Sequence, residues 1–282
     1  QFGSDRLIAG DFKAFDKKMS CAIMQEAFRV IMEISEASGN FDRDDLRVIQ
    51  GIAWDTSFPL VDFNGDLVRF YGSNPSGHPL TVIINGLCNS LYMRYCYYLL
   101  NPMKEVESFR KNVALMTYGD DNSMNVSPSI DFYTHTAIQG EFAKLGITYT
   151  MADKEALSIP FISMEECSFL KRKWRFNPIT CAFDAPLDEE SIEKSLTVWV
   201  RSKNVLPQEQ AVDIVSSALR EYFFYGKDKF EEKRILFQQM IHDLDLTLYM
   251  KESTLPTYDS LIEKWNQTSD QLKHVSLIGL RR

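Results

Sequence analysis

The sequence predicts an α+β fold in which an antiparallel sheet flanked by helices is followed by an entirely helical region. The clearest strand signal lies at 113–126, where an apolar, partly β-branched run leads through a turn at Gly119 into alternating polar and apolar residues. Short apolar runs at 7–11 and 147–151 are typical of further strands. From residue 186 onward only helical spacing occurs. The chain is therefore predicted to have two parts that differ in secondary structure.

The remaining elements follow from spacing, caps and turn residues. In the first part we expect a helix ending at Gly39, a helix at 42–54, a hairpin at 60–70 with Asn-Gly at its turn, and helices at 80–100 and 130–145. One further strand is expected at 168–176. The helices expected in the second part lie at 189–202, 208–225, 228–250 and 257–266.

A domain boundary is expected near Pro186, where the composition changes. The length of 282 residues suits one large domain or two modest ones. Just after the proline, Leu187 and Ile192 bracket Asp188 in the pattern of a hydrophobic staple around a helix cap. The predicted domains are 1–185, with an insertion at about 40–80, and 186–282.

Composition narrows the class of protein. Hydrophobic content of 45% indicates a folded globular chain. A net charge of −8 argues against a nucleic-acid binder on the total alone, although acids at a metal site also enter that total. Five cysteines without C-x-x-C spacing favour free thiols. The apolar stretch 80–100 is interrupted by Asn85, Asn89 and Arg94, which are costly in lipid, so we expect a buried helix and no membrane anchor.

The predicted turn at Tyr118-Gly119-Asp120-Asp121 holds two adjacent carboxylates. Like charges repel, so such a pair is costly unless a cation lies beside it, and oxygen ligands suit Mg²⁺ or Mn²⁺. An ordinary acidic turn would also give this pattern, so the turn alone does not decide between the two.

The order of the polar residues along the chain is more specific. A strand ending in Asp11-x₄-Asp16 comes first, then Ser76-Gly77-x₃-Thr81-x₃-Asn85 opening a helix, then the Asp-Asp hairpin. Adjacent strands can bring Asp11 beside the hairpin carboxylates, giving a cluster for two metal ions about 3.5–4 Å apart. Such a pair stabilises the attacking and leaving oxygens of an in-line phosphoryl displacement.

Five segments together make the chain resemble viral RNA-dependent RNA polymerases, most closely those of picornaviruses and their insect and algal relatives. The segments similar to motifs A to E of that family are Asp11–Asp16, Ser76–Asn85, Tyr118–Asp121, Gly146–Lys154 and Phe169–Arg172. The resemblance implies that the first predicted domain is a palm with part of the fingers, and that the second is a thumb. The chain also begins without Met, and the family's triphosphate-gripping basic element and most of its fingers lie upstream of motif A. We therefore expect a fragment that is poorly active alone.

The resemblance implies a role for each acid. Asp11 and Asp120 would carry two Mg²⁺ ions, with Asp121 assisting and the Phe12 carbonyl as a further ligand; Mn²⁺ could substitute. Tyr118 and Gly119, with Lys171 and Arg172, would contact the primer RNA. Lys154 would protonate the departing pyrophosphate. Alternatively, Lys154 is a solvated lysine without a catalytic role, and Lys171 and Arg172 lie on a solvated basic strand.

A second group implied by the resemblance would select the sugar. Asp16 and Asn85 would read the ribose 2′-hydroxyl, which both donates and accepts a hydrogen bond, while Ser76, Gly77 and Thr81 would shape that pocket. Reverse transcriptases usually carry a bulky side chain where Asp16 stands. RNA synthesis is therefore favoured.

The implied function is template-directed RNA synthesis in viral genome replication. The implied partners are an RNA template and primer, ribonucleoside triphosphates and other replication proteins, including a protein primer. The implied location is the host cytoplasm, at membrane-associated complexes.

Three alternative functions stay open. A reverse transcriptase would use dNTPs, a non-catalytic RNA scaffold need not bind two divalent ions, and another two-metal phosphotransferase or nuclease would not need the Asp16–Asn85 pair.

Overall fold

The computed structural model describes residues 2–154 and 156–279, and the side chains of these up to residue 268. The chain forms two compact units, Gln1–Leu170 and Lys171–Arg282, which are considered separately below. The composition change at Pro186 lies within the second unit. The assignment of palm and thumb boundaries stays a prediction.

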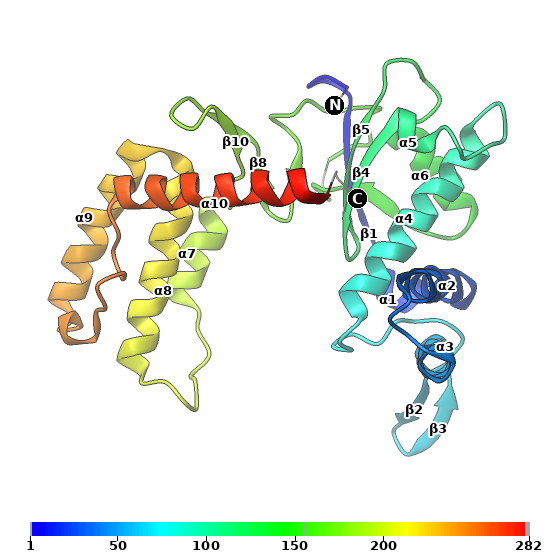
Figure 1. Cartoon of the computed structure of the whole chain (residues 1–282), viewed down its shortest axis with the longest axis horizontal. Coiled ribbons are helices and arrows are strands. Elements are labelled where there is room, and N and C mark those ends of the chain that lie inside the picture. The colour runs from blue at the N-terminus through cyan, green and yellow to red at the C-terminus, as the bar shows by residue number, and fades with distance from the viewer. Residues whose placement is uncertain (1, 155, 280–282) are drawn as a thin grey trace. The chain divides into compact units, whose positions relative to one another are not determined.

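The first unit is built on a four-stranded antiparallel sheet in the order β4-β5-β1-β6 (Figure 1). Its strands are β1 (Leu7–Phe12), β4 (Val113–Tyr118), β5 (Asp121–Val126) and β6 (Tyr149–Met151). The three strand regions predicted from apolar runs are thus confirmed. Because β1 lies between β5 and β6, its last residues come to the end of the sheet where β4 turns into β5.

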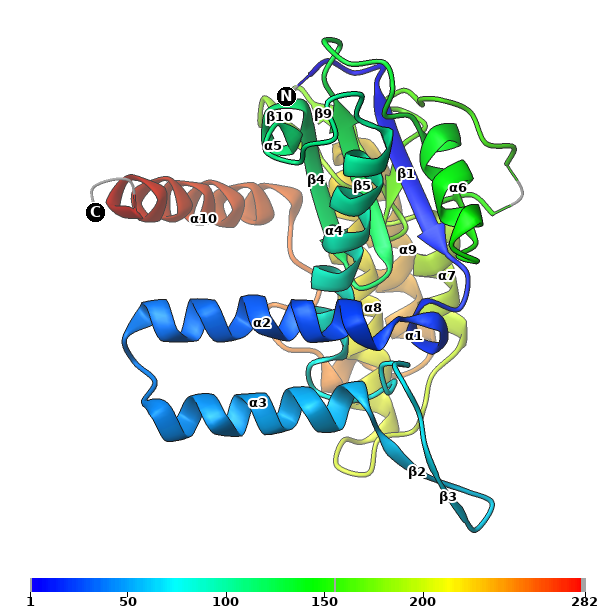
Figure 2. The same cartoon turned by 90° about the vertical axis from the view of Figure 1, so that its right-hand side faces the viewer.

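Helices α4 (Thr81–Leu100) and α6 (His135–Lys144) cover one face of this sheet, as Figure 2 shows. Alternation along the strands sends Ile8 and Met124, which are opposite each other in the ladder, into the core beneath these helices. The residues that alternate with them along each strand, including Asp11 and Asp121, therefore face the opposite side of the sheet. The long helix predicted at 80–100 is confirmed, whereas the one predicted at 130–145 begins later, after the cap residue Thr134.

Gly10 allows the sheet to close around a buried tyrosine. A Cβ atom at Gly10 would lie 1.9 Å from the hydroxyl oxygen of Tyr149. That hydroxyl donates a 2.7 Å hydrogen bond to Oδ1 of Asn122, the ladder partner of Gly10. A side chain here would displace Tyr149 and with it the neighbouring end of β1.

The other elements of this unit extend the core to one side. Helix α2 and helix α3 form an antiparallel pair, and the hairpin β2–β3 follows α3 (Figure 2). The predicted end of a helix at Gly39 is confirmed, with Gly39 in the left-handed conformation after α2. Asp42 caps α3 in a capping box with Asp45. The bounds are α1 (Phe15–Lys18), α2 (Cys21–Ser38), α3 (Arg43–Ser57), β2 (Leu60–Phe63), β3 (Asp66–Arg69), α5 (Phe109–Asn112) and β7 (Ser168–Phe169).

The second unit is mainly helical. Its helices surround a core that includes Leu219, Phe230, Phe237 and Tyr258. Leu187 forms an isolated β-bridge with Arg172, and after it the regular elements among the described residues are helices and 3₁₀ turns, as predicted. The elements are β8 (Arg172–Lys173), β9 (Arg175–Asn177), β10 (Ala182–Asp184), α7 (Glu189–Thr197), α8 (Pro207–Tyr222), η1 (Phe223–Tyr225), α9 (Lys227–Asp243), η2 (Thr247–Tyr249) and α10 (Tyr258–Gly279).

The single strand predicted at 168–176 is wrong. The structure has three short strands there, because Leu170 and Lys171 adopt positive φ values of 55° and 61° and so break the extended chain. The helices predicted at 189–202 and 228–250 also end early, at Thr197 and Asp243.

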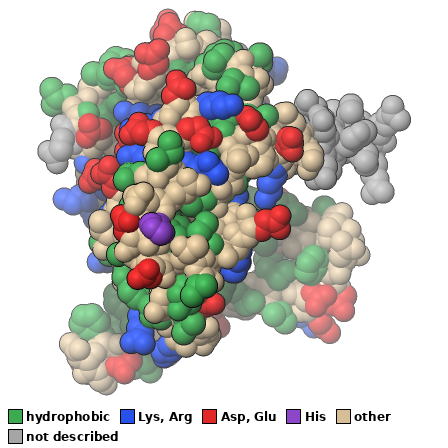
Figure 3. Space-filling model, turned by 90° about the vertical axis from the view of Figure 1, so that its left-hand side faces the viewer, with side chains coloured by type: hydrophobic (Ala, Val, Ile, Leu, Met, Phe, Trp, Pro, Cys, Tyr) green, Lys and Arg blue, Asp and Glu red, His purple; other side chains and the backbone are tan. Residues whose placement is uncertain are grey.

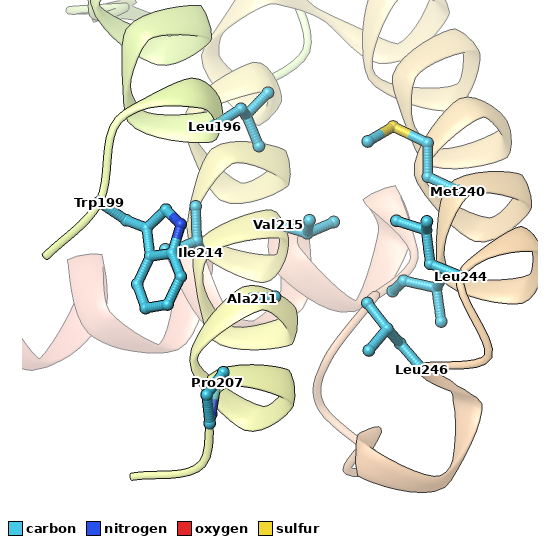
Figure 4. Close-up of a pocket in the computed structure, with 10 residues that line it drawn as sticks. Leu196, Trp199, Pro207, Ala211, Ile214, Val215, Met240, Leu244 and Leu246 are labelled. Carbon is cyan, nitrogen blue, oxygen red and sulfur yellow. The ribbon is translucent and has the colours of Figure 1, made fainter. Parts of the chain in front are cut away.

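No described helix is both long and apolar enough to span a bilayer. An apolar cavity of about 150 Å³ lies among α7, α8 and α9 (Figure 4). Trp199 and Leu196 line one side and Met240 and Leu244 the other. Its described lining contains no titratable side chain, so this cavity offers no group for acid–base catalysis or metal binding.

Candidate active site

The turn between β4 and β5 brings two carboxylates to the end of the sheet. Tyr118 pairs with Asp121, which leaves Gly119 and Asp120 as the two turn residues. Gly119 has a φ of 62°, so glycine suits this position. A positive φ at the first turn residue alone is the pattern of a type II′ hairpin. The β1–β5 ladder runs up to Gly10 and Asn122, so the next residue of β1, Asp11, lies beside the turn.

Helix α4 holds the turn from the core side. The side-chain amide of Asn89, which is fully buried, donates to the backbone carbonyl oxygens of Gly119, Asp120 and Asp121 at 3.2, 2.8 and 3.2 Å. One helical turn earlier, the carbonyl oxygen of Gly86 accepts a 3.1 Å hydrogen bond from the Thr117 hydroxyl. With their carbonyl oxygens directed toward the helix, the turn residues are fixed in one backbone conformation.

The carboxylates of this cluster interact electrostatically. Burial raises the pKa of Asp120, and the nearby charges of Asp11 and Asp16 raise it further. Burial also raises the pKa of Asp121, with repulsion from Asp120 and Asp11 adding to it. The cluster therefore carries more negative charge than its protein surroundings neutralise.

Lys154 supplies part of the missing positive charge. Its ammonium nitrogen lies 2.6 Å from Oδ2 of Asp11, whose side chain is largely buried. The hydrogen bond to Asp11 and the attraction of that carboxylate raise the pKa of Lys154, so the amine is protonated at neutral pH. The lysine side chain is nevertheless 70% exposed, and it can leave Asp11 without disturbing the core.

The cluster suits divalent cations in its chemistry. Its side-chain donors are the carboxylate oxygens of Asp11, Asp120 and Asp121, which are the ligands that Mg²⁺ and Mn²⁺ prefer. Within the described residues, no three His, Cys, Asp or Glu side chains are already gathered around one point. The pKa values of Asp120 and Asp121 are raised first by burial and then by repulsion from neighbouring carboxylates, and a bound cation would offset both effects.

A second polar group lies beside the cluster, where the loop before α4 meets α1. One carboxylate oxygen of Asp16 accepts a 2.7 Å hydrogen bond from the Ser76 hydroxyl, and the other accepts from the side-chain amide of Asn85. The Thr81 hydroxyl donates to the Pro75 carbonyl oxygen at 2.8 Å. Residues that are 60 and 69 positions from Asp16 in the sequence are thus joined directly to it.

Asn74 orients this second group, and sequence reasoning did not single it out. Its side chain is only 2% exposed and donates to Oδ1 of Asn85 at 2.7 Å. Its backbone N–H donates to the Asp16 carbonyl oxygen at 2.9 Å. Because Asn85 accepts from Asn74 with its oxygen, its amide nitrogen faces Asp16.

The comparisons with known proteins agree with this geometry. A family model described as viral RNA-dependent RNA polymerase matches residues 2–241. The chain belongs to this family.

Relatives of this polymerase-family chain include large viral polyproteins. It is 31% identical over 240 residues to the replicase polyprotein of Drosophila C virus, and 29% identical over 245 residues to that of cricket paralysis virus. These matches cover 81% and 82% of the chain, but 14% of each polyprotein. The RNA1 polyprotein of Arabis mosaic virus is 40% identical over 160 residues, which is 56% of the chain and 7% of that polyprotein.

A solved structure has the same fold. The sicinivirus 3Dpol RNA-dependent RNA polymerase matches with a TM-score of 0.71 at 16% identity, over 94% of this chain and 52% of that one. The predicted α+β polymerase fold and the predicted picorna-like family are therefore confirmed.

Most of the predicted site residues of this family member lie in the first compact unit. Asp11, Asp120, Asp121 and Lys154 come together at the end of the sheet, and Asp16 is within electrostatic reach of Asp120. Ser76 and Asn85 are bonded to Asp16, while the side chain of Phe12 is packed in the core. Gly77 follows Ser76 in the loop, and Thr81 is the first residue of α4. The roles assigned to all of these residues stay predictions.

The two basic residues predicted to grip the primer lie in the second unit. Arg172 forms a two-pronged ion pair with Glu221 of α8, with both nitrogen–oxygen distances 2.9 Å, and also donates to the Ala185 carbonyl oxygen. Lys171 is exposed, and its ammonium is 4.0 Å from Asp188. On the face drawn in Figure 3, basic and acidic side chains of the described residues are intermingled. Binding of RNA by Lys171 and Arg172 stays a prediction, with a structural partner competing for Arg172.

Two positions that matter to the site were missed as contributors. Asn89 was noted only as a polar interruption of an apolar stretch, and Asn74 not at all. A signal existed for Asn89, since it follows Asn85 by four residues and so shares its helix face. For Asn74 the local sequence gave no comparable sign.

Proposed function

We propose that this chain carries the active site of an RNA-dependent RNA polymerase. In viral genome replication this site would extend the 3′-hydroxyl of an RNA primer with ribonucleoside triphosphates, in the order that an RNA template directs. One observation carries the proposal: Asp11, Asp120 and Asp121 lie within electrostatic reach of one another at the end of the sheet, with Lys154 paired to Asp11 and the Asp16–Asn85 hydrogen bond nearby. Family membership supports it.

Asp11, Asp120 and Asp121, with the carbonyl oxygen of Phe12, would hold two Mg²⁺ ions, and Mn²⁺ could substitute. Such ions lower the pKa of an attacking hydroxyl and offset the charge of the transferring phosphoryl group. The protein's part is to keep the carboxylates together and partly desolvated despite their repulsion, which their raised pKa values reflect.

Lys154 would complete the proton balance. The primer oxygen forms a bond to the α-phosphorus and loses its proton to solvent water, while the bond from that phosphorus to the bridging oxygen of pyrophosphate breaks. The departing oxygen needs a proton, and Lys154 holds one at neutral pH because its pKa is raised. Its exposed side chain can move from Asp11 to the leaving group.

Asp16 and Asn85 would select ribose. Each carboxylate oxygen has two lone pairs, so Asp16 can accept from a 2′-hydroxyl while still bonded to Ser76 and Asn85. The second hydrogen of the Asn85 amide can donate to the same hydroxyl. A deoxyribose would leave these groups unpaired, which is the strongest way to reject it.

The remaining roles rest on the family resemblance. Tyr118, Gly119, Lys171 and Arg172 would contact the primer, and attraction to phosphate would dominate the binding of RNA. Template, primer, ribonucleoside triphosphates and other viral replication proteins, including a protein primer, would be the partners. The place of action would be the host cytoplasm, at membrane-associated replication complexes.

Primer extension by a chimera tests this function. The chain would replace its 240-residue match in the Drosophila C virus replicase, and extension on an RNA template would be measured with NTPs or dNTPs, in Mg²⁺ or EDTA. Metal-dependent extension that prefers NTPs is expected. Preference for dNTPs would favour a reverse transcriptase. RNA binding without extension would favour a non-catalytic scaffold, provided that the parent replicase is active in the same assay.

A further inference from the structure

The side chain of Asn89 in α4 donates hydrogen bonds to the backbone of the catalytic turn. It is the only described side chain for which hydrogen bonds to three successive carbonyl oxygens of the turn are found, those of Gly119, Asp120 and Asp121. An amide group has two hydrogens, so the three contacts share them, with the shortest bond, 2.8 Å, going to Asp120. The carbonyl oxygens of both catalytic aspartates are thus directed at α4.

Helix α4 also contacts the turn at Gly86. A Cβ atom built on Gly86 would be 3.6 Å from Oγ1 of Thr117 and 3.7 Å from the backbone nitrogen of Gly119, which are ordinary van der Waals distances. The Gly86 carbonyl oxygen accepts the hydrogen bond from the Thr117 hydroxyl. Gly86 and Asn89 therefore contact the same turn from neighbouring positions of α4.

The chemistry of Asn89 favours a positioning role over a packing role. Its Oδ1 atom is buried and has no hydrogen-bond partner among the described residues, which is unfavourable for a polar atom. Leucine has the same number of side-chain heavy atoms in the same branching pattern, and it would avoid that cost in this apolar helix. What leucine cannot supply is the donor to the turn, so the donor is the feature that explains asparagine here.

The same helix turn links two parts of the site. Asn85, which is bonded to Asp16, precedes Asn89 by four residues, so one stretch of α4 contacts the sugar-selecting group and the metal-binding turn. We propose that Asn89 is a positioning residue: it fixes the backbone of the turn so that the carboxylates of Asp120 and Asp121 are directed toward Asp11. This inference rests on the proposed function, since it concerns the metal ligands of that site.

Mn²⁺ titration calorimetry on the full 282-residue chain tests the proposal, with Asn89→Leu as the main variant. Loss of a residue that orients metal ligands lowers metal affinity by about 10- to 100-fold. Amide hydrogen exchange at residues 119–122 is expected to speed up in parallel. The matched control is Asn101→Leu, because Asn101 is also buried, at the residue that caps the C-terminus of α4, but bonds to Glu105, away from the turn.

The outcomes separate the two claims. A folded Asn89→Leu chain that binds Mn²⁺ as tightly as the wild type would overturn the positioning role, as would an equal loss in Asn101→Leu. If the wild type itself takes up no Mn²⁺, the proposed function fails. Unchanged amide exchange in Asn89→Leu would overturn the positioning role separately, because the turn would then not depend on its hydrogen bonds to Asn89. Should Asn89→Leu fail to fold, the isosteric Asn89→Asp decides on the same terms, since a carboxylate would repel the three carbonyl oxygens.

Discussion

The two hairpins of the first unit have similar local sequences and different surroundings. The β2–β3 turn, Asn64-Gly65, has both φ values positive, 55° and 94°, and stabilises itself through a 2.8 Å hydrogen bond from the Gly65 amide to Asp62. Its strands are almost entirely exposed. The β4–β5 turn also relies on a glycine, yet its carbonyl oxygens are held by Asn89 from a helix about 30 residues earlier.

This difference shows what a turn sequence specifies and what it does not. Both turns could be predicted as hairpins, because glycine and the Asx residues carry their own backbone preferences. Only the second turn is fixed by tertiary contacts and is brought beside another acidic strand end.

The largest effect is expected from Asp120→Asn in the chimeric polymerase. Neutralising one carboxylate removes a metal ligand, so extension should fall to background while RNA binding is retained. Asp66→Asn is the reference, because it neutralises an aspartate next to the exposed turn and should leave extension unchanged. Gel-based extension and filter binding measure both. Comparable loss of RNA binding in Asp120→Asn would mean that the residue is structural.

A smaller but more specific effect is expected from Asp16→Ala. The 2′-hydroxyl would lose an acceptor and Asn85 its bonded partner, so the preference for NTPs over dNTPs should drop by about tenfold or more. The ratio of kcat/KM for ATP and dATP measures it. Asn74→Ala should reduce the same ratio less, because Asn85 loses only the bond that orients it. An unchanged ratio in Asp16→Ala would remove the proposed role from that residue.

Stability should reveal the same contrast. Asn89→Ala leaves buried carbonyl oxygens of the turn without their donor, so the free energy of unfolding should fall by about 1–3 kcal/mol. Asp62→Ala removes an exposed hydrogen bond, and about 0.5–1 kcal/mol is expected. Urea titration of the 282-residue chain gives both values. Equal losses would contradict the view that only one of the turns is held by tertiary contacts.

The smallest effect concerns pH. The pKa values of Asp120 and Asp121 are raised in the fold, so the folded chain binds more protons than the unfolded chain above the ordinary pKa of 3.8. These two groups therefore lower stability as the pH rises through and above that value. Asp121→Asn should unfold at higher urea than the wild type at pH 7, and the difference should shrink toward pH 4. A difference that grows toward pH 4 would contradict the raised pKa.

The fold could be predicted where local patterns are strong. The β4–β5 hairpin, the helix at 80–100 and the helical second part all have clear periodicity or turn chemistry. The region 168–176 could not, because positive φ at Leu170 and Lys171 is not signalled by glycine. The order of acids predicted which residues meet in the site. The contribution of Asn74 depends on a loop folding back onto α4, which no short pattern encodes.

The central claim is that the acids at the end of the sheet form a site for two divalent ions. Titration of the 282-residue chain with Mn²⁺, followed by electron paramagnetic resonance, tests it directly because free and bound ions are counted separately. The account predicts two bound ions per chain with magnetic coupling between them, and loss of this coupling in Asp11→Asn. Absence of bound Mn²⁺, or binding that is unchanged in Asp11→Asn, would contradict it.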